Sequence, residues 1–251
     1  MVKARTQGDS HPRRRRGLPW RIARTLTLVL LGALALSAGS VLALRWISPP
    51  TSAFMLEAWA GALWHHDRNY HTRYQWRDLE AISPRAAIAV IAAEDQLFPF
   101  HAGFDFKSIR AAVRAHERGA RLRGASTITQ QVAKNLFLWP GRSFVRKALE
   151  AMFTVMIEAC WPKERILEVY LNIAEFGHGI YGVQAAARAF FHKDAFRLNS
   201  AESALLAVVL PNPHLYRVDA PSRYVLGQRD WTLRQMAALG GPAYLNAIEP
   251  P

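Results

Sequence analysis

The chain has only one cysteine, Cys160, among its 251 residues. A lone thiol has no partner for an internal disulfide, so a disulfide framework is excluded. Cys160 follows an apolar run and precedes Trp161, which predicts a buried, inert thiol and not a nucleophile. Because 51% of the residues are hydrophobic, the bulk of the chain is expected to fold, and its length suits one well-cored domain with an appendage.

Negative charge is also scarce, with 19 acidic residues against 32 basic ones and a net charge of +13. Such a balance is common in proteins that bind nucleic acid, but here the excess is uneven. Residues 1–24 carry eight basic side chains and one acidic side chain, which is more than half of the net charge. This tail directly precedes a hydrophobic segment, an arrangement typical of a membrane-topology signal. We therefore predict no nucleic-acid partner.

One long uncharged run stands out, at residues 25–44. Twenty residues form a helix of about 30 Å, enough to cross the bilayer core. Its eight leucines and two valines contribute roughly −3 to −6 kcal/mol towards insertion. A cleaved signal peptide is the alternative, since small residues occur at Ala33 and Ala35, but the apolar core of a signal peptide usually spans about 7–15 residues. We predict a cytoplasmic tail at 1–24, an uncleaved transmembrane anchor at 25–44 and a domain outside the cytoplasm at 45–251.

The remainder of the sequence predicts a mainly α fold. Ser83 followed by Pro84 is a typical helix start, and no alternating run is long enough to demand a sheet. The apolar, tryptophan-containing segment 53–64 is expected either at a membrane interface or packed in the domain. The basic segment 104–123 suits an anionic membrane surface or a solvated face. Helices are predicted at residues 86–94, 106–118, 126–138, 144–160, 163–174, 181–191 and 201–210.

The first polar cluster is Glu94-Asp95-x-x-Phe98-x-x-His101-x-Gly103. Glu94 falls near the C-terminal end of its predicted helix, where the helix dipole disfavours a negative charge, and its apolar neighbours would desolvate it. Both effects raise a carboxyl pKa, as a general base working near neutral pH requires. The alternative is a surface salt bridge. No second His or Cys lies at ligand spacing from His101, so a structural hydrogen bond is expected there and not a metal.

The second cluster is Gly124-x-Ser126-Thr127-Ile-Thr-Gln130-Gln131-x-x-Lys134-Asn135. Ser126 is predicted to cap a helix on which Thr127, Gln131 and Lys134 fall within about 60° of one another. The residues Ile128, Val132 and Leu136 fall on a separate, apolar arc. A helix N-terminus with a lysine on one face can bind phosphate. The alternative is a capped surface helix, and a nucleotide P-loop is excluded because Gly-x-x-x-x-Gly-Lys is absent.

A third group contains Arg142, Arg146, Lys147 and Glu150. Arg146 and Glu150 are four residues apart on one predicted helix, which favours an intrahelical ion pair worth about 0.2–0.5 kcal/mol. Taken alone, this group indicates nothing more than that ion pair.

The three groups, in this order and spacing, resemble the motifs of the family 51 glycosyltransferases, the peptidoglycan glycosyltransferases. Arg165-Ile-Leu-Glu-Val-Tyr-Leu-Asn172 and Ser200-Ala-Glu-Ser-Ala-Leu-Leu206 resemble the fourth and fifth motifs, so the likeness covers roughly residues 50–220. Asn172-Ile-Ala-Glu-Phe-Gly177 and Leu210-Pro-Asn-Pro213 resemble the monofunctional biosynthetic transglycosylases in particular. The Ser-x-x-Lys signature of penicillin-binding transpeptidases is absent from the chain.

The resemblance implies a lysozyme-like helical domain behind a single transmembrane helix, which polymerises lipid II with inversion and releases undecaprenyl diphosphate. It implies that Glu94 is the general base for the acceptor's 4-hydroxyl and that Glu150 is the second catalytic carboxylate. The cations Lys134, Arg142 and Arg146 would hold the diphosphate. The other substrate- or diphosphate-binding positions would be Ser126, Thr127, Gln131, Asn135, Asp95 and His101.

The same resemblance implies a protein of the bacterial inner membrane, with the catalytic domain in the periplasm. Its partners would be lipid II, the nascent glycan chain, the bilayer and other cell-wall synthesis proteins. No obligatory cofactor is expected and no all-protein metal cage is evident, although Mg²⁺ or Mn²⁺ is compatible with a diphosphate leaving group.

Two positions depart from the family pattern. Ala125 replaces a usual glycine and Ala102 a common aspartate, which affects the local loop geometry.

Two other functions are compatible with parts of the sequence. A lytic enzyme on a lysozyme-like fold would also use two carboxylates, but it would not need Lys134 and the two arginines. A non-enzymatic basic membrane protein would leave Glu94 and Lys134 dispensable.

Overall fold

The computed structural model of the chain describes residues 18–118 and 126–248. Ala125 and most of the predicted basic tail therefore lie outside the described residues. Two compact units are present, residues 1–40 and residues 41–251.

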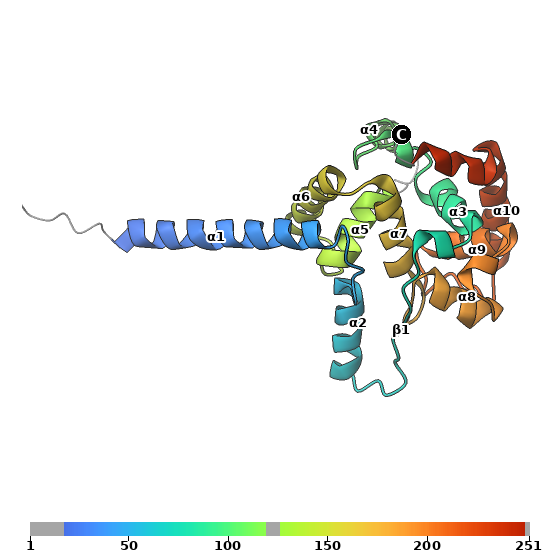
Figure 1. Ribbon diagram of the computed structural model, residues 1–251, viewed down its shortest axis with the longest axis horizontal. Helices are drawn as coiled ribbons and strands as arrows, with labels where there is room; N and C mark the ends of the chain where they lie inside the picture. Colours follow the sequence, from blue (N-terminus) through green and yellow to red (C-terminus); the bar gives the residue numbers. More distant parts are fainter. Residues whose placement is uncertain (1–17, 119–125, 249–251) are drawn as a thin grey trace, which may run out of the picture. The chain divides into compact units, whose positions relative to one another are not determined.

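The helix α1 (Leu18–Ala43) supplies the N-terminal apolar element (Figure 1). Its segment Trp20–Ala43 is long and apolar enough to cross a membrane by length and composition, with a mean hydropathy of 2.2. The helix begins seven residues before the predicted span, because Arg21 and Arg24 are good helix formers and do not interrupt it. The predicted N-terminal apolar helix is confirmed, while the side of the membrane on which each end lies stays a prediction.

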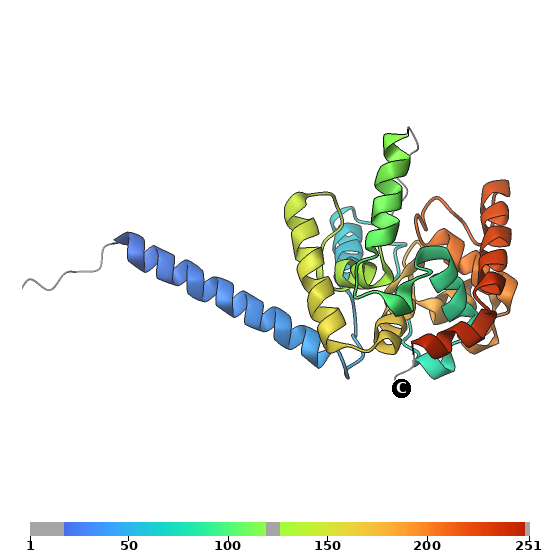
Figure 2. The same ribbon diagram turned by 90° about the horizontal axis from the view of Figure 1, so that it is seen from above.

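The core of the second unit is built from two groups of packed helices, as Figures 1 and 2 show. In one group α3 (Pro84–Glu94) packs against α9 (Ser200–Val209) and α10 (Arg223–Ala238). In the other, α5 (Ile128–Phe137) packs against α6 (Phe144–Cys160) and α7 (Lys163–Ile173). The helix α8 (Val183–Phe191) contacts both α7 and α9. The predicted mainly helical fold is confirmed.

The helix α2 (Ala53–Trp64) packs on α5 but leaves four large apolar side chains in solvent, namely Leu56, Trp59, Leu63 and Trp64. Ser52 caps it by accepting a hydrogen bond from the Met55 amide, and Met55 is buried. Trp59 and Trp64 are 55% and 82% exposed, so they are not part of the core. The basic segment forms α4 (Phe106–Glu117), which is also an amphipathic helix.

A small three-stranded sheet was not predicted from the sequence. It contains β1 (Arg73–Tyr74), β2 (Glu175–Gly177) and β3 (Ile180–Tyr181) in the order β1-β3-β2. β3 is parallel to β1 and antiparallel to β2, with Glu175 opposite Tyr181 and an irregular register at Gly177. Strands of two or three residues are too short to show an alternating pattern, which is why sequence periodicity misses them.

The β2–β3 hairpin is held close to α7 by a glycine. Gly182 has a φ of 84°, and a Cβ added there would lie 2.5 Å from the Asn172 carbonyl oxygen. Its amide donates to the Ala174 carbonyl at 2.9 Å, which ties the end of the hairpin to the end of α7. This contact fixes the side of the hairpin that carries Glu175 and His178.

Several element boundaries differ from the predicted ones. α10 was missed because only Val225, Thr232 and Met236 of its sixteen residues are buried, too few for a clear apolar period. The predicted helix at 181–191 begins at Val183, since Tyr181 belongs to β3. Cys160 is half-buried, whereas the sequence predicted a buried thiol. Short 3₁₀ helices complete the unit at Leu79–Ala81, Phe98–Phe100, Ala195–Arg197 and Gly241–Ala247.

Candidate active site

Glu94 is the last residue of α3, as the sequence predicted. Residues 86–92 of this helix are all buried, so the helix is fixed in the core and delivers Glu94 at its C-terminal end. The Glu94 carboxylate accepts a hydrogen bond from the side-chain amide nitrogen of Gln131 at 2.7 Å. The Gln131 side-chain oxygen in turn accepts from the Tyr170 hydroxyl at 3.1 Å. The chain of contacts joins α3, α5 and α7 at one carboxylate.

The surroundings of Glu94 raise the pKa of its carboxyl group above the ordinary value of 4.5. Burial is the largest cause, and the neighbouring charge of Asp95 adds to it. The hydrogen bond from Gln131 and the charge of Lys134 act in the opposite direction. The net direction is the one expected of a group that must both hold and release a proton near neutral pH.

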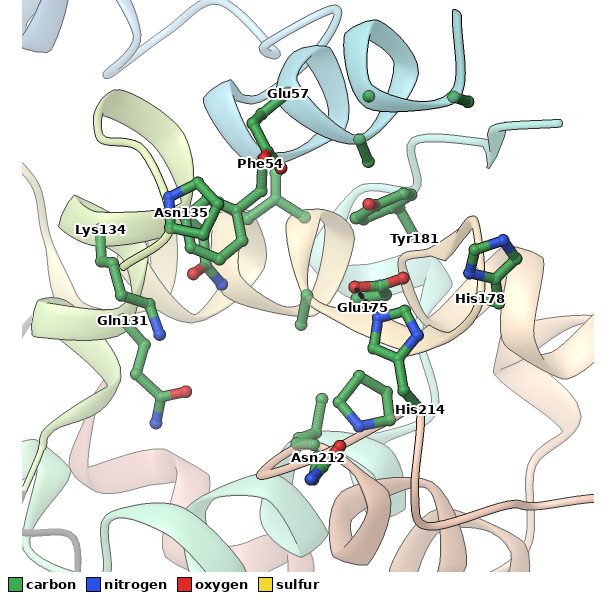
Figure 3. A pocket seen from close by; sticks show the side chains of 18 of the residues that line it. Phe54, Glu57, Gln131, Lys134, Asn135, Glu175, His178, Tyr181, Asn212 and His214 are labelled. Atoms are coloured by element: carbon green, nitrogen blue, oxygen red, sulfur yellow. Dashed lines mark ion pairs between the residues drawn. The ribbon is translucent and has the colours of Figure 1, made fainter. Parts of the chain in front are cut away.

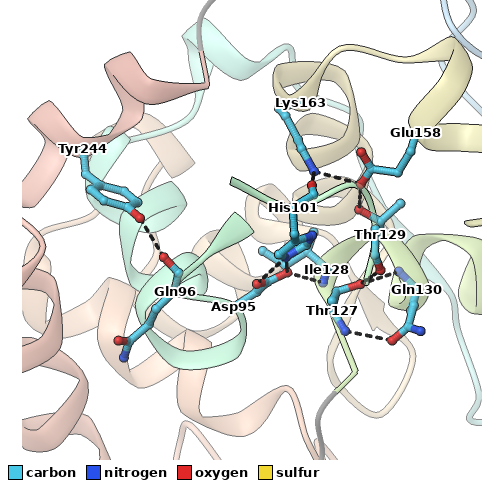
Figure 4. A network of polar contacts seen from close by, with 11 residues as sticks. Asp95, Gln96, His101, Thr127, Ile128, Thr129, Gln130, Glu158, Lys163 and Tyr244 are labelled. Carbon is cyan, nitrogen blue, oxygen red and sulfur yellow. Dashed lines mark hydrogen bonds and ion pairs between the residues drawn. The ribbon is translucent and has the colours of Figure 1, made fainter. Parts of the chain in front are cut away.

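Asp95 and His101 hold the start of α5 (Figure 4). Asp95 is 6% exposed, and one carboxylate oxygen lies 2.8 Å from His101 Nε2. Its other oxygen accepts from the Ile128 amide at 3.0 Å, at the first residue of α5. Neither Asp95 nor His101 lines the cavity described below. The structural hydrogen bond predicted for His101 is confirmed.

Thr127, and not Ser126, caps α5, which corrects the predicted cap. The Thr127 hydroxyl accepts from the Gln130 amide at 3.2 Å and donates to the Gly103 carbonyl at 2.7 Å. The Gln130 side chain accepts from the Thr127 amide at 3.1 Å, completing a capping box. Ser126 is exposed just before the helix. The cap is one residue later than predicted because Thr127 is the residue that also contacts the buried loop at Gly103.

We expect Asp95→Ala to destabilise the domain by about 2–4 kcal/mol, because it leaves the buried Ile128 amide and His101 without their acceptor. In circular dichroism of the full chain in detergent, the melting temperature should fall by about 5–10 °C. Asp230→Ala is the matched control, since that carboxylate is half exposed and its ion pair among the described residues is with neighbouring Arg229. Equal melting temperatures for the two variants would show that the Asp95 network does not stabilise α5.

A cavity of about 580 Å³ lies along α5 (Figure 3). Glu94 is not among the residues that line it, and is linked to it by the hydrogen bond from Gln131, which does line it. One side is formed by Gln131, Lys134 and Asn135 of α5, with Tyr170 of α7 next to them. The predicted separation of the α5 faces is confirmed, since Ile128, Val132 and Leu136 are buried in the core. The volume lies within the range of about 300–1,000 Å³ typical of small-molecule sites.

Lys134 is the cation of this cavity. Among the described residues it makes no ion pair, and its ammonium lies 5.5 Å from the centre of the Phe54 ring. Burial lowers the pKa of Lys134 below 10.5, and the charge of Glu150 opposes this. Next to it, the Asn135 side-chain oxygen is buried without a hydrogen-bond partner in the described part of the chain. Lys134 and Asn135 therefore have polar capacity that the protein itself does not use.

Glu150 is engaged by two cations of its own helix. Its carboxylate is 2.8 Å from Arg146 Nη1, and Lys147 pairs with the second oxygen. The predicted ion pair between Arg146 and Glu150 is thus confirmed. Glu150 does not line the cavity, but its charge acts on Lys134. Arg142 lies exposed in the loop before α6 and does not line the cavity either.

The opposite side of the cavity carries residues to which the sequence analysis assigned no role. Glu175 of β2, His178 of the hairpin turn and His214 after α9 face Lys134 and Gln131 across the cavity in Figure 3. His214 Nε2 lies 3.4 Å from a Glu175 carboxylate oxygen, and the Gly179 amide donates to the other at 3.2 Å. Burial raises the pKa of Glu175, and His214 opposes the shift. The sequence shows the motif at 172–177, but Glu175 and His178 line the cavity only because the β2–β3 hairpin turns them towards it.

No group of three or more His, Cys, Asp or Glu side chains suited to a metal ion occurs in residues 18–118 and 126–248. The polar capacity of the cavity lies instead in amides, imidazoles, carboxylates and one lysine.

The site joins a carboxylate of raised pKa, hydrogen-bonded to a residue that lines the cavity, to a cavity lysine that makes no ion pair among the described residues. This combination suits group transfer with general-base assistance on an anionic substrate. The sequence matches the family described as Transglycosylase over residues 62–237. It is 53% identical to a biosynthetic peptidoglycan transglycosylase of Xanthomonas campestris pv. campestris strain B100, over 91% of this chain and 94% of that protein. A protein of the same description from Xylella fastidiosa strain 9a5c is 51% identical over 91% of this chain and 93% of its own. The chain belongs to the transglycosylase family and is a peptidoglycan glycosyltransferase.

Proposed function

We propose that this enzyme polymerises lipid II into linear glycan strands, with inversion at C1 and release of undecaprenyl diphosphate. The observation that carries the proposal is the placement of Glu94. Its carboxylate has a raised pKa and is hydrogen-bonded at 2.7 Å to Gln131, a cavity-lining residue on the same helix as Lys134.

In the proposed reaction, ionised Glu94 accepts the proton of the acceptor's 4-hydroxyl. The resulting oxygen bonds to C1 of the growing chain as the bond from C1 to the diphosphate oxygen breaks. Gln131, held by Tyr170, links the carboxylate to the cavity that Gln131 lines. Negative charge grows on the leaving diphosphate, and Lys134 is available to meet it because it has no ion pair among the described residues.

The other predicted site residues take two kinds of role in this proposal. Arg142 and Ser126 are exposed and do not line the cavity, and we assign them to contacts with the parts of the substrate that extend beyond it. Asp95, His101 and Thr127 are occupied by the protein and act by placing α5. We assign Glu150 to the orientation of Arg146 and Lys147, with which it forms two ion pairs that leave one positive charge in excess. Asn135, with its unused buried oxygen, is assigned to a substrate hydroxyl or amide.

We also propose that α1 anchors the chain in the inner membrane, with residues 1–24 in the cytoplasm and residues 45–251 in the periplasm. The basic tail beside an apolar helix supports this orientation. Lipid II and the nascent glycan then reach the cavity from the bilayer, without an obligatory cofactor.

The test is incubation of the purified full chain, in detergent or vesicles, with fluorescent lipid II. We expect high-molecular-weight glycan that a muramidase digests. A preparation that folds but yields no polymer would contradict the proposal. A lytic enzyme would instead clear a suspension of isolated cell walls. The structure offers less support for that activity, because cleavage of a neutral glycan does not require a cavity lysine without an ion pair among the described residues.

A further inference from the structure

A second cavity of about 350 Å³ adjoins the first. His178, Pro213 and His214 line both cavities, so these three side chains form a common wall. The imidazole rings of His178 and His214 are 5.5 Å apart and inclined at 68°. Both histidines are exposed, so the shared wall reaches the protein surface and does not seal one cavity from the other. We call this shared wall the rim.

Strand β2 runs from one cavity to the other. Glu175 lines the first cavity, whereas Phe176 and Gly177 line the second. β2 is an edge strand of the small sheet. A substrate in the first cavity can thus extend along β2 into the second without leaving the surface of the protein.

The second cavity differs from the first in which polar side chains line it. Half of its ten lining residues are apolar, namely Phe176, Ile180, Phe190, Pro213 and Val218. No amide side chain lines it, and its one carboxylate, Asp219, is held by Arg217 through two hydrogen bonds of 3.0 and 2.6 Å.

Arg217 gives the second cavity an excess donor. A guanidinium has five N–H donors, and Asp219 occupies two of them. The remaining donors suit a carboxylate, and the apolar wall suits small methyl-bearing side chains. A short peptide that carries a carboxylate and alanine side chains has both features.

We propose that the second cavity binds the peptide of the substrate. This inference rests on the proposed function, because lipid II carries a short acidic, alanine-containing peptide on the sugar that bears the diphosphate. With the sugar in the first cavity, the peptide crosses the rim at His178 and His214 and lies along β2. Arg217 receives a peptide carboxylate, and Ile180 and Phe190 contact its methyl groups.

The experiment compares two substrates, lipid II with its full pentapeptide and the same lipid-linked disaccharide with the peptide cut back to one alanine. Arg217→Glu reverses the charge of a side chain that lines the second cavity, and Ile180→Trp fills that cavity; neither residue lines the first cavity. We expect Arg217→Glu to lose roughly tenfold in kcat/KM with the full substrate, the size of one charge-assisted contact. Ile180→Trp should lose a similar factor because the indole occupies the space of the peptide. Each variant should lose less than twofold with the truncated substrate. Arg229→Glu is the matched control, an arginine that also pairs with a nearby aspartate but lines neither cavity.

Three results would overturn the inference. An equal loss with both substrates would assign the two residues a structural role. A shortened glycan product with both substrates would assign the cavity to a further sugar of the chain. Unchanged kinetics in both variants would leave the peptide outside the cavity. Wild-type inactivity with either substrate would instead count against the proposed function, so the two failures are distinct.

Discussion

Glu94→Gln is expected to lower the polymerisation rate by about 10²–10⁴-fold, the contribution of a positioned general base. Glutamine keeps the size of the side chain and an oxygen that can still accept from Gln131, so the cavity should keep its shape. The measurement is kcat for polymerisation of fluorescent lipid II by the full chain. Glu80→Gln, at an exposed glutamate outside the cavity, is the control and should retain full activity.

The same substitution should not reduce stability at neutral pH. A carboxyl whose pKa is higher in the folded state than in the unfolded chain holds its proton more tightly when folded. Its ionised form therefore destabilises the fold above that pKa, and the penalty disappears as the pH falls. Glutamine removes the penalty, so the melting temperature at pH 7 should be equal to or above that of the wild type. An inactive variant with a much lower melting temperature would mean that folding, and not catalysis, was lost.

Lys134→Met should reduce kcat/KM about 10- to 100-fold, which corresponds to the roughly 1.5–3 kcal/mol of a hydrogen bond to a charged group. Methionine keeps the unbranched stem beside Phe54 and removes only the charge. Lys134→Arg keeps the charge and should recover part of the loss. Lys193→Met is the control, because that lysine pairs with Glu202 and does not line the cavity. Full activity of Lys134→Met would exclude this lysine from diphosphate binding.

The pH profile distinguishes the two roles. Glu94 must be ionised to act as a base, and its raised pKa places the acidic limb of the rate profile above pH 4.5. Lys134 must be protonated to bind the diphosphate, and its lowered pKa places the alkaline limb below pH 10.5. The wild type should therefore show a bell-shaped profile. Residual activity of Glu94→Gln should lack the acidic limb, and that of Lys134→Met should lack the alkaline limb.

The helices were predictable from the sequence where apolar residues recur with the 3.6-residue period along one continuous segment. α6 begins and ends where the sequence placed it, and the buried arc of α5 follows its 3.6-residue period. α10 failed the same test, because its partners α3 and α9 cover only a few of its side chains. The cap of α5 shifted from Ser126 to Thr127 because a contact with Gly103, twenty-four residues earlier, decides which hydroxyl is buried.

By itself the sequence determined the mainly helical fold, the N-terminal apolar helix and the family, because these depend on local periods and on motifs of fixed spacing. Only the tertiary structure decided which polar groups meet. Glu94 and Gln131 are 37 residues apart, and Asp95 and Ile128 are 33 apart, so no local rule connects them. The wall formed by Glu175, His178 and His214 likewise exists only because a short hairpin and a distant loop fold against the same cavity. Packing of the helices sets these long-range contacts, and through them the chemistry of the site.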